Sequence, residues 1–358
     1  MKKIKAGIIG CGAISLAKHL PGLKTIGEAE IVAFCDIVGE KAQFAAKEYG
    51  TPDAKVYSDY MELLKDESID TIHVCTPNRS HSFITIDALE AGKHVICEKP
   101  MAKTYAEAKL MMDASEKTGK LLTIGYQNRL TPQNLFLKAS IEKGDLGEIY
   151  FAKAHAIRRR GIPNWGVFLN EEEQGGGPLI DIGTHALDLT LWFMDNYKPK
   201  IVVGSVFKKL ATENKSPTLG SFNPSDYKVE DSAFGYIVME NGATVYLESS
   251  WALNMLDGNE AACTLCGTKG GADMRDGLRI NCEVHDALAV IKPDPGSSGT
   301  SYFMSSSNNS KVDLEQRAFY DAVLYDKPLV IHPYQALVVS QILEAIYTSS
   351  KTGMPVLF

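Results

Sequence analysis

The sequence lacks the features that mark several classes of protein. No stretch reaches the ~18 consecutive apolar residues of a membrane-spanning helix. Basic residues are not in excess, because 37 Lys and Arg stand against 44 Asp and Glu and leave a net charge of −7. A chain of this charge has no broad basic surface for nucleic acid phosphates. We therefore expect an ordinary soluble globular protein with neither a membrane nor a nucleic acid as partner.

Signals for disulfides, metal binding and export are also weak. The seven cysteines are an odd number, and four lie in or beside apolar segments, where a thiol behaves as a small hydrophobe: Cys11, Cys35, Cys75 and Cys97. Cys263 and Cys266 make a CxxC, but no second pair of Cys or His stands at zinc spacing, so we expect no metal. The N-terminal lysines are followed by an apolar run that glycines interrupt, without a cleavage site, so we expect a cytoplasmic protein.

The first part of the chain alternates between two patterns. Short apolar runs rich in β-branched residues predict strands at 5–10, 30–36, 71–76, 94–99 and 121–126. Helical patterns lie between them at 13–26, 38–49, 80–91 and 104–118. Apolar strands separated by helices predict a doubly wound parallel sheet, an α/β fold. Ligands of such sheets bind at the carboxyl ends of the strands.

The pattern changes after residue 126. Helices are expected near 133–143 and 180–194 and again at 313–325 and 334–351, with a strand-like run at 148–159. Further runs follow without long helices between them, with an NG hairpin signal at 241–242, which predicts an antiparallel sheet: 200–208, 230–239, 243–251 and 260–267. The segments 211–228 and 292–310 are expected to be loops. We therefore predict two domains, 1–126 and 127–358.

A glycine-rich loop follows the first predicted strand and opens the first predicted helix. Gly10 permits the tight turn, Gly12 lets a pyrophosphate approach the backbone, and the small Ser15 allows close packing of helix on strand. The free amides at the start of the helix, in Gly12-Ala13-Ile14-Ser15, then bind the anion. In this context the loop predicts a dinucleotide site.

Asp36 ends the second predicted strand, 36 − 12 = 24 residues after Gly12. A carboxylate near this spacing receives the ribose hydroxyls of the adenosine half. The alternative role is a simple cap for the helix at 38–49. As a ribose ligand Asp36 would repel a 2′-phosphate, so the sequence favours NAD over NADP.

Further motifs resemble those of the Gfo/Idh/MocA oxidoreductases, which include inositol and sugar dehydrogenases. The resemblance covers nearly the whole chain and is carried by Thr76-Pro77-Asn78 with His81, by Glu98-Lys99-Pro100, and by the run from Gly177 to Asp188, GPLIDIGTHALD. It implies a Rossmann domain followed by an α/β domain with a large, mainly antiparallel open sheet. In this family such a sheet often forms the subunit interface, which implies a homodimer or homotetramer.

The same resemblance implies the catalytic set Lys99, Asp181 and His185. His185 would take the proton of a substrate hydroxyl, Lys99 would stabilise the developing alkoxide, and Asp181 would position substrate or histidine. The residues themselves agree, since Asp181 and His185 are four apart on a predicted helix and share one face. The alternatives are a surface lysine, a first-turn helix acid and a buried packing histidine. Asp188 is either a supporting partner or a solvated residue.

Other positions receive roles from the resemblance. Those expected along the cofactor are Thr76, Pro77, Asn78, His81, Glu98 near the nicotinamide ribose, Lys99, and Gln127 near the nicotinamide end. Arg129 matches an arginine of the family near the substrate. By position alone, in the loop that leads from a predicted strand to the catalytic helix, Arg158 and Trp165 are expected to wall the substrate pocket, with one arginine of 158–160 meeting a polar group of the substrate. Tyr126 and Asn164 are further candidates around the substrate. A structural salt bridge is an equal alternative for Arg129.

Three functions are compatible with these residues. The first is an NAD-dependent dehydrogenase that oxidises a secondary hydroxyl of a sugar, inositol or related polyol. The second is a glycoside-cleaving enzyme that uses bound NAD for transient oxidation and elimination, which net release of NADH would exclude. The third is a non-catalytic NAD-binding sensor, for which loss of Lys99 or His185 would be expected, and both are present.

Overall fold

The computed structural model describes residues 3–210, 218–293 and 311–358. The chain divides into two compact units. The first contains the described parts of Met1–Gln127 and Asn308–Leu337, and the second contains those of Asn128–Ser307 and Val338–Phe358. Each unit is considered by itself.

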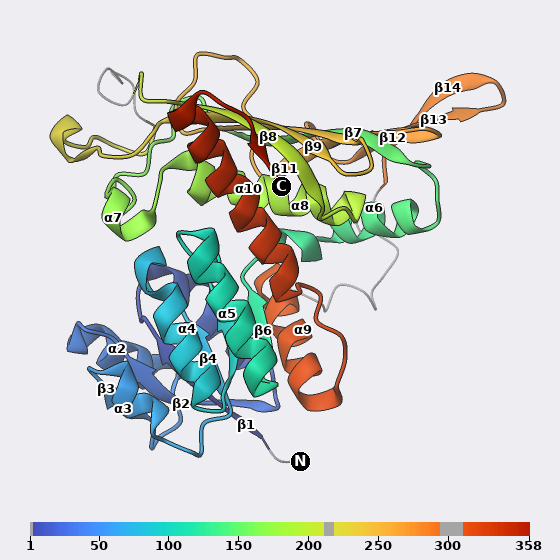
Figure 1. Cartoon of the computed structure of the whole chain (residues 1–358). Coiled ribbons are helices and arrows are strands. Elements are labelled where there is room, and N and C mark those ends of the chain that lie inside the picture. Colours follow the sequence, from blue (N-terminus) through green and yellow to red (C-terminus); the bar gives the residue numbers. More distant parts are fainter. Residues whose placement is uncertain (1–2, 211–217, 294–310) are drawn as a thin grey trace. The chain divides into compact units, whose positions relative to one another are not determined.

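The first unit is built on a six-stranded sheet in the order β3-β2-β1-β4-β5-β6 (Figure 1). All its pairs are parallel, so the predicted doubly wound α/β fold is confirmed. The strands are β1 (Ile4–Ile9), β2 (Ala29–Cys35), β3 (Lys55–Tyr57), β4 (Thr71–Val74), β5 (His94–Cys97) and β6 (Leu122–Ile124). The sequence missed β3, because this short strand is largely exposed and has no apolar run.

Helices cover both faces of this sheet. They are a π-helical turn, η1 (Ser15–His19), which continues into α1 (Leu20–Thr25), then α2 (Gly39–Tyr49), α3 (Tyr60–Leu64), a 3-10 turn, η2 (Asn78–Ser80), α4 (His81–Glu90), α5 (Tyr105–Thr118) and α9 (Lys311–Tyr325). One face packs Ile4, Ala6 and Ile8 of β1 against residues of α1, α2 and α9. On the other face α4 and α5 lie side by side (Figure 1).

The position of α9 differs from the predicted division at residue 126. Phe319 and Tyr320 of this helix are buried in the core that surrounds β1, so α9 belongs to the first unit. The sequence could not show this, because helical periodicity reveals a buried face and not the sheet against which that face packs.

The second unit contains a nine-stranded sheet in the order β14-β13-β12-β11-β7-β10-β9-β8-β15. Among the described strands of this second sheet, only the β10–β7 pair is parallel, which confirms the expected, mainly antiparallel sheet. The strands are β7 (Ile149–Ile157), β8 (Pro199–Phe207), β9 (Ser232–Met239), β10 (Thr244–Ser250), β11 (Ala262–Gly267), β12 (Gly270–Asp273), β13 (Arg279–Val284), β14 (Ala287–Ile291) and β15 (Val356–Leu357). Gly242, with φ of +87°, makes the predicted hairpin turn between β9 and β10.

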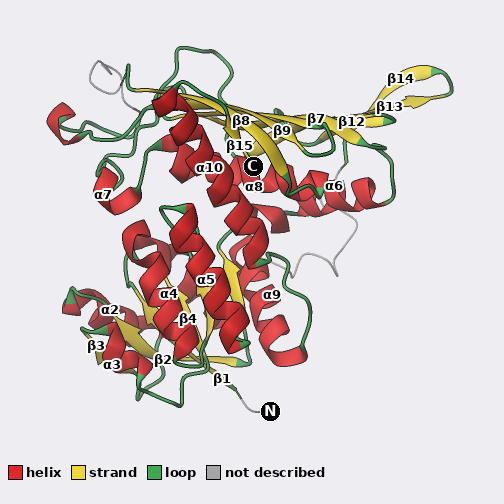
Figure 2. Ribbon diagram, viewed as in Figure 1, coloured by secondary structure: helices red, strands yellow, loops and turns green. Residues whose placement is uncertain are grey.

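Helices pack on one face of this sheet (Figure 2). They are α6 (Pro132–Glu142), α8 (Thr184–Met194) with a preceding π-helical turn, η4 (Leu179–Gly183), and α10 (Pro333–Thr352), of which the part from residue 338 belongs to this unit. The short α7 (Glu171–Gln174) lies in the loop before η4. Close packing of α10 needs glycine on the strands, since a Cβ on Gly204 would stand 2.6 Å from the Ile346 carbonyl oxygen.

Two predicted loops are only partly described. Residues 211–217 of the first and 294–310 of the second lie outside the described residues. The remainder of the first carries one short turn, η5 (Pro224–Asp226). Among the helices of the described residues, none is both long and apolar enough to cross a membrane.

Candidate active site

The glycine loop has the geometry that a dinucleotide needs. Gly10 has φ of +93°, and a Cβ there would lie 2.6 Å from the carbonyl oxygen of Cys75, so no other residue fits this turn. A Cβ on Gly12 would meet no atom within 4 Å, which leaves its backbone open to a ligand. Ser15 is fully buried, as expected for close packing of helix on sheet.

Asp36 links this loop to the end of β2. Its Oδ2 accepts the backbone N–H of Cys11 at 2.8 Å, and its Oδ1 accepts that of Val38, also at 2.8 Å. The helix α2 begins at Gly39, and the residue at its cap is Val38. Asp36 is therefore not the cap of that helix, and its half-exposed carboxylate lies directly beside the glycine loop.

The loops after β4 and β5 are joined by His81. This imidazole is buried, with Nε2 2.9 Å from the carbonyl oxygen of Thr76 and Nδ1 2.8 Å from that of Pro100. Burial lowers its pKa. Both ring nitrogens contact the protein, so His81 supports the segments that carry Pro77-Asn78 and Lys99.

Glu98 lies at the centre of a buried network at the end of β5. Its Oε1 accepts from Lys18 Nζ at 2.6 Å and from His19 Nε2 at 2.8 Å, and its Oε2 accepts the backbone N–H of Lys99 at 3.2 Å. Lys18 also donates to Gln127 Oε1 at 3.1 Å and pairs with Glu315 of α9 at 2.7 Å. Lys18 thus brings together Glu98 and Gln127, the two residues expected near nicotinamide.

The charges in this network determine its protonation. Although burial opposes ionisation, Lys18 and His19 hold the pKa of Glu98 well below its usual range. Burial would lower the pKa of Lys18, but Glu315 and Glu98 together raise it. Burial lowers the pKa of His19 despite its bond to Glu98. Near neutral pH the network therefore contains an ammonium, a carboxylate and a neutral imidazole.

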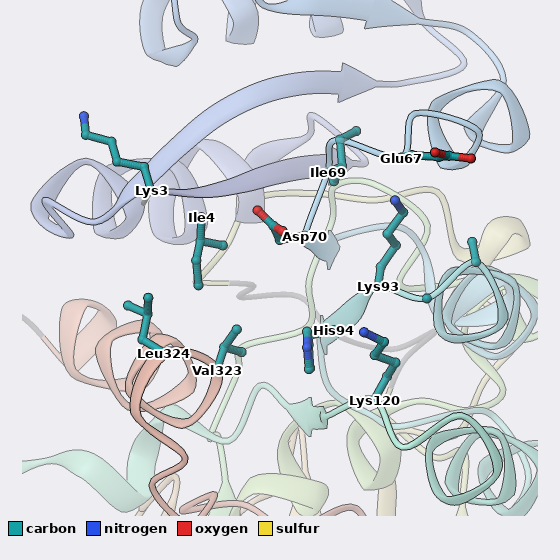
Figure 3. A pocket seen from close by; sticks show the side chains of 12 residues that line it. Lys3, Ile4, Glu67, Ile69, Asp70, Lys93, His94, Lys120, Val323 and Leu324 are labelled. Atoms are coloured by element: carbon teal, nitrogen blue, oxygen red, sulfur yellow. The ribbon is translucent and has the colours of Figure 1, made fainter. Parts of the chain in front are cut away.

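A cavity of about 460 Å³ lies at the amino ends of the strands of the first sheet, away from Glu98 at the carboxyl end of β5 (Figure 3). Its walls come from the starts of strands and from α9, and they include Ile4, Asp70, His94 and Leu324. Dinucleotides bind at the carboxyl ends of parallel strands, whereas this cavity is at the amino ends. It is therefore separate from the glycine loop and from Glu98.

In the second unit, the helix that carries Asp181 and His185 is anchored by Glu230. This buried carboxylate accepts the backbone N–H of Gly177 at 2.8 Å and of Leu179 at 3.1 Å, and the hydroxyl of Tyr347 at 2.8 Å. Acceptors at a helix start satisfy amides that have no partner within the helix. Burial raises the pKa of Glu230.

Asp181 is oriented by a tryptophan. Trp251 is fully buried and donates from Nε1 to Asp181 Oδ2 at 3.0 Å. Arg158 is bound by both carboxylate oxygens of Glu260, at 2.6 and 2.7 Å. Burial lowers the pKa of Arg158, but Glu260 and the nearby charge of Asp181 raise it overall. The structure thus brings Asp181 and Arg158 into one electrostatic environment.

Arg129 is completely buried and makes a two-point ion pair with Asp188, at 2.9 and 2.5 Å. This is the structural salt bridge that the sequence left as an alternative, and it identifies Asp188 as a buried partner and not a solvated residue.

Tyr126, in the first unit, is also buried.

The loop that carries Asn164 and Trp165 lies beside the described part of the loop predicted at 211–228. Asn164 donates from Nδ2 to the Ser221 carbonyl at 3.3 Å, and the Thr218 N–H donates to the Arg160 carbonyl at 2.9 Å. Trp165 is 50% exposed and stacks edge-on against Phe168, which contacts Trp251 in the same way. Three aromatic rings in contact thus connect the exposed Trp165 with the buried Trp251, which binds Asp181.

Several supporting residues were not predicted. Lys18, His19, Glu230, Trp251 and Tyr347 bear on the site through contacts between distant segments, which no local motif shows. A lysine and a histidine that follow a glycine loop by a few residues were the one available signal.

The cysteines show no sign of a metal site in the described residues. All seven are unpaired, and no group of three or more His, Cys, Asp or Glu is placed to hold an ion in that part of the chain. Cys263 lies buried in β11, and burial raises its pKa.

Comparison with known proteins agrees with this geometry. Residues 4–126 match a family model described as an oxidoreductase family with an NAD-binding Rossmann fold, and residues 135–273 match the GFO/IDH/MocA C-terminal domain. D-glucoside 3-dehydrogenase of Escherichia coli is 35% identical over 350 residues, which cover 98% of this chain and 96% of that protein. Inositol 2-dehydrogenase of Salmonella paratyphi B is 28% identical over 76% of this chain and 74% of its own.

A solved structure of levoglucosan dehydrogenase in complex with NADH has the same fold, with a TM-score of 0.82 at 22% identity over 99% of both chains. The sequence motifs, the glycine loop and the two family models point to the same group of proteins. The chain belongs to the Gfo/Idh/MocA family of oxidoreductases, and its first unit is an NAD-binding Rossmann domain.

Proposed function

We propose that this oxidoreductase transfers a hydride between a secondary hydroxyl of a sugar, inositol or related polyol and NAD. The observation that carries the proposal is the anchored helix with Asp181 and His185 four residues apart, where Trp251 orients the carboxylate at 3.0 Å. The relatives named D-glucoside 3-dehydrogenase and inositol 2-dehydrogenase support a CH–OH group as the reacting centre.

In the proposed reaction His185 takes the proton of the substrate hydroxyl. An imidazole is suited to this step because its ordinary pKa lies near neutral pH. Asp181 positions the substrate or His185, and the Lys99 ammonium stabilises the negative charge that develops on the substrate oxygen. NAD, when bound, supplies the hydride acceptor.

The residues of the first unit fit this cofactor. The backbone around Gly12 is open, and Asp36 stands beside the loop to receive ribose hydroxyls. We assign Glu98 and Gln127 to the nicotinamide half, because Lys18 holds both. Thr76, Pro77 and Asn78 are assigned to the span between the two halves.

Asp36 also leads us to propose NAD over NADP. A 2′-phosphate placed against this carboxylate is electrostatically costly, and the next residue, Ile37, offers no positive charge. Titration of both nucleotides into the purified protein tests this. Asp36→Ser combined with Ile37→Arg should narrow or reverse the preference, and equal affinities in the unchanged protein would reject the role of Asp36.

A panel of polyols, sugars and glycosides with NAD, followed by the absorbance of NADH, tests the reaction itself. Net accumulation of NADH supports a dehydrogenase. Cleavage of a glycoside without net NADH would instead favour transient oxidation and elimination, and turnover of no substrate would favour a sensor.

We also propose that the protein is a homodimer or homotetramer that associates through its open sheet. Val203, Tyr236 and Tyr246 are register partners on adjacent strands and share the face away from α8 and α10. Val203 and Tyr236 are exposed there. Light scattering after size exclusion tests this, and Tyr236→Glu should shift the protein toward monomer.

The cytoplasmic location stays a prediction.

A further inference from the structure

A chain of buried side chains runs from Glu98 along the first sheet. Glu98 Oε1 lies 2.8 Å from His19 Nε2, and His19 Nδ1 lies 2.8 Å from His73 Nδ1. His73 Nε2 then lies 3.1 Å from the Tyr320 hydroxyl, which lies 3.0 Å from that of Thr71. His19, His73, Tyr320 and Thr71 are all fully buried, so water does not complete these contacts.

The hydrogen bonds in this chain can run in only one direction. The ionised Glu98 only accepts, so His19 donates from Nε2. Burial keeps both imidazoles neutral by lowering the pKa of His19 and, more strongly, that of His73. A neutral ring has one N–H, so His19 Nδ1 accepts and His73 Nδ1 donates. His73 Nε2 must then accept from Tyr320, whose oxygen accepts from Thr71.

The opposite direction conflicts with Glu98. If the Tyr320 hydroxyl donated to Thr71, His73 would donate from Nε2 and its Nδ1 would accept. His19 would then donate from Nδ1 and turn the lone pair of Nε2 toward the carboxylate, 2.8 Å away. Two acceptors at that distance repel each other, and a buried acceptor without a donor is costly.

Lys18 alone does not orient the carboxylate. Its ammonium has three rotatable donors at the end of a flexible chain, and it divides them among Glu98, Gln127 and Glu315. The planar ring of His19, fixed edge-on to His73 with an interplanar angle of 86°, is the rigid donor. It leaves Oε2 of Glu98 with the Lys99 N–H at 3.2 Å and with further capacity to accept.

We propose that His19, His73 and Tyr320 are positioning residues, which form a one-directional hydrogen-bond relay that fixes the proton of His19 on Nε2 and holds the Glu98 carboxylate in place for the nicotinamide half of NAD. The inference rests on the proposed role of Glu98. It assigns to α9, which is distant in sequence, a part in cofactor binding.

The protonation pattern is tested directly by NMR of protein with ¹⁵N-labelled histidine. Long-range ¹⁵N–¹H spectra between pH 6 and 8 should show His19 with its proton on Nε2, His73 with its proton on Nδ1, and both rings neutral. His19 protonated on Nδ1, or either ring as an imidazolium in this range, would overturn the relay.

The function of the relay is tested with Tyr320→Phe. This change removes the hydroxyl that donates to His73 Nε2. NAD affinity should fall roughly three- to tenfold, the scale of one buried hydrogen bond. Affinity for ADP, which contains only the adenosine side, should be unchanged. The matched control is Tyr60→Phe, which removes another tyrosine hydroxyl of this unit, bonded to Asp87 Oδ2 at 2.7 Å, and should alter neither affinity.

A structural role alone gives a different pattern. Equal weakening of NAD and ADP in Tyr320→Phe, or unchanged affinity for both, would overturn the relay. Glu98→Gln separates this failure from that of the proposed function: if it weakens NAD binding while Tyr320→Phe does not, only the relay is wrong. If neither variant weakens NAD binding, the role of Glu98 is wrong as well.

Discussion

Two buried glutamates, one in each unit, are stabilised by different physical means. Glu98 in the first unit is bound by an ammonium and an imidazole, and its pKa is lowered. Glu230 in the second unit is bound by two backbone amides and a tyrosine hydroxyl, and burial raises its pKa. Within the described parts of the chain, no lysine or arginine forms an ion pair with Glu230.

The difference shows what each carboxylate is suited to do. A carboxylate matched by a neighbouring cation stays ionised near neutral pH, so Glu98 offers a ligand a charged acceptor. A carboxyl group bound only by neutral donors, such as backbone amides, can accept their hydrogen bonds at the start of a helix in its ionised and in its protonated form. Glu98 is thus suited to bind a ligand, whereas Glu230 fixes the start of the helix that contains Asp181 and His185.

The largest effect should come from His185→Ala, which tests whether proton transfer belongs to the helix anchored by Glu230. Turnover should fall by roughly 10²–10⁴, the usual contribution of a general base. NAD affinity should be nearly unchanged, because His185 is assigned to the substrate hydroxyl and not to the cofactor. Lys99→Ala is the companion variant, with a loss on the order of 10²–10³.

The opposing outcome for this pair is equally clear. If melting temperature and NAD affinity fell in parallel with turnover, His185 and Lys99 would be structural residues. Near wild-type turnover in folded, NAD-binding protein would refute the catalytic role of the residue replaced.

Lys18→Met removes the cation that distinguishes the Glu98 site. The variant leaves Glu98 and Glu315 buried without their partner, and removing one member of a buried ion pair costs roughly 3–5 kcal/mol. Denaturant unfolding should show this loss, and NAD affinity should fall with it. Lys55→Met, which removes an exposed partner of Asp66, is the control and should change stability little. Equal stability of the two variants would show that Glu98 does not need its cation.

Glu230→Gln tests the other half of the comparison through pH. The folded-state pKa of Glu230 is raised, so its protonated form favours folding, and this contribution is lost as pH rises above about 4.3, the ordinary value. The stability of the unchanged protein relative to Glu230→Gln should therefore fall as pH rises from about 4.3 to the raised folded-state pKa, and stay constant above it. Melting curves of both proteins across this range provide the measurement, and a difference that rises with pH would contradict the assignment.

The smallest effect is expected from Tyr347→Phe. This change removes one of the three donors to Glu230 and leaves both backbone amides in place. Unfolding free energy should fall by about 1 kcal/mol, while KM for NAD stays the same. A change in NAD affinity larger than the change in stability would show that Glu230 has a ligand role after all.

The sequence predicted elements whose signals are local. Five strands of the first sheet lie in the predicted regions, because a buried parallel strand needs an unbroken apolar run. The helices between them were predicted from their amphipathic spacing. The short strands β12, β13 and β14 were missed, since they carry glycine, polar residues or little burial. A strand with few buried positions does not need apolar residues at alternate positions, so its sequence shows no clear alternation.

The same distinction applies to the site. Asp36 and the glycine loop were found because their spacing along the chain reflects one turn and one strand. Glu230 was not, because its contact with Gly177 joins residues 53 positions apart and no pattern of residue types marks it. Tyr320 contacts His73 across 247 positions. Such pairs are determined by tertiary packing alone.

The place of α9 has a consequence for synthesis on the ribosome. When the first 127 residues have left the exit tunnel, all six strands of the Rossmann sheet are available, but Glu315, Phe319 and Tyr320 have not yet been made. Lys18 then lacks one of its two carboxylates, and one face of β1 lacks part of its cover. Domains usually fold as their chain emerges, but this one must wait for almost the entire protein to be translated before its core is complete.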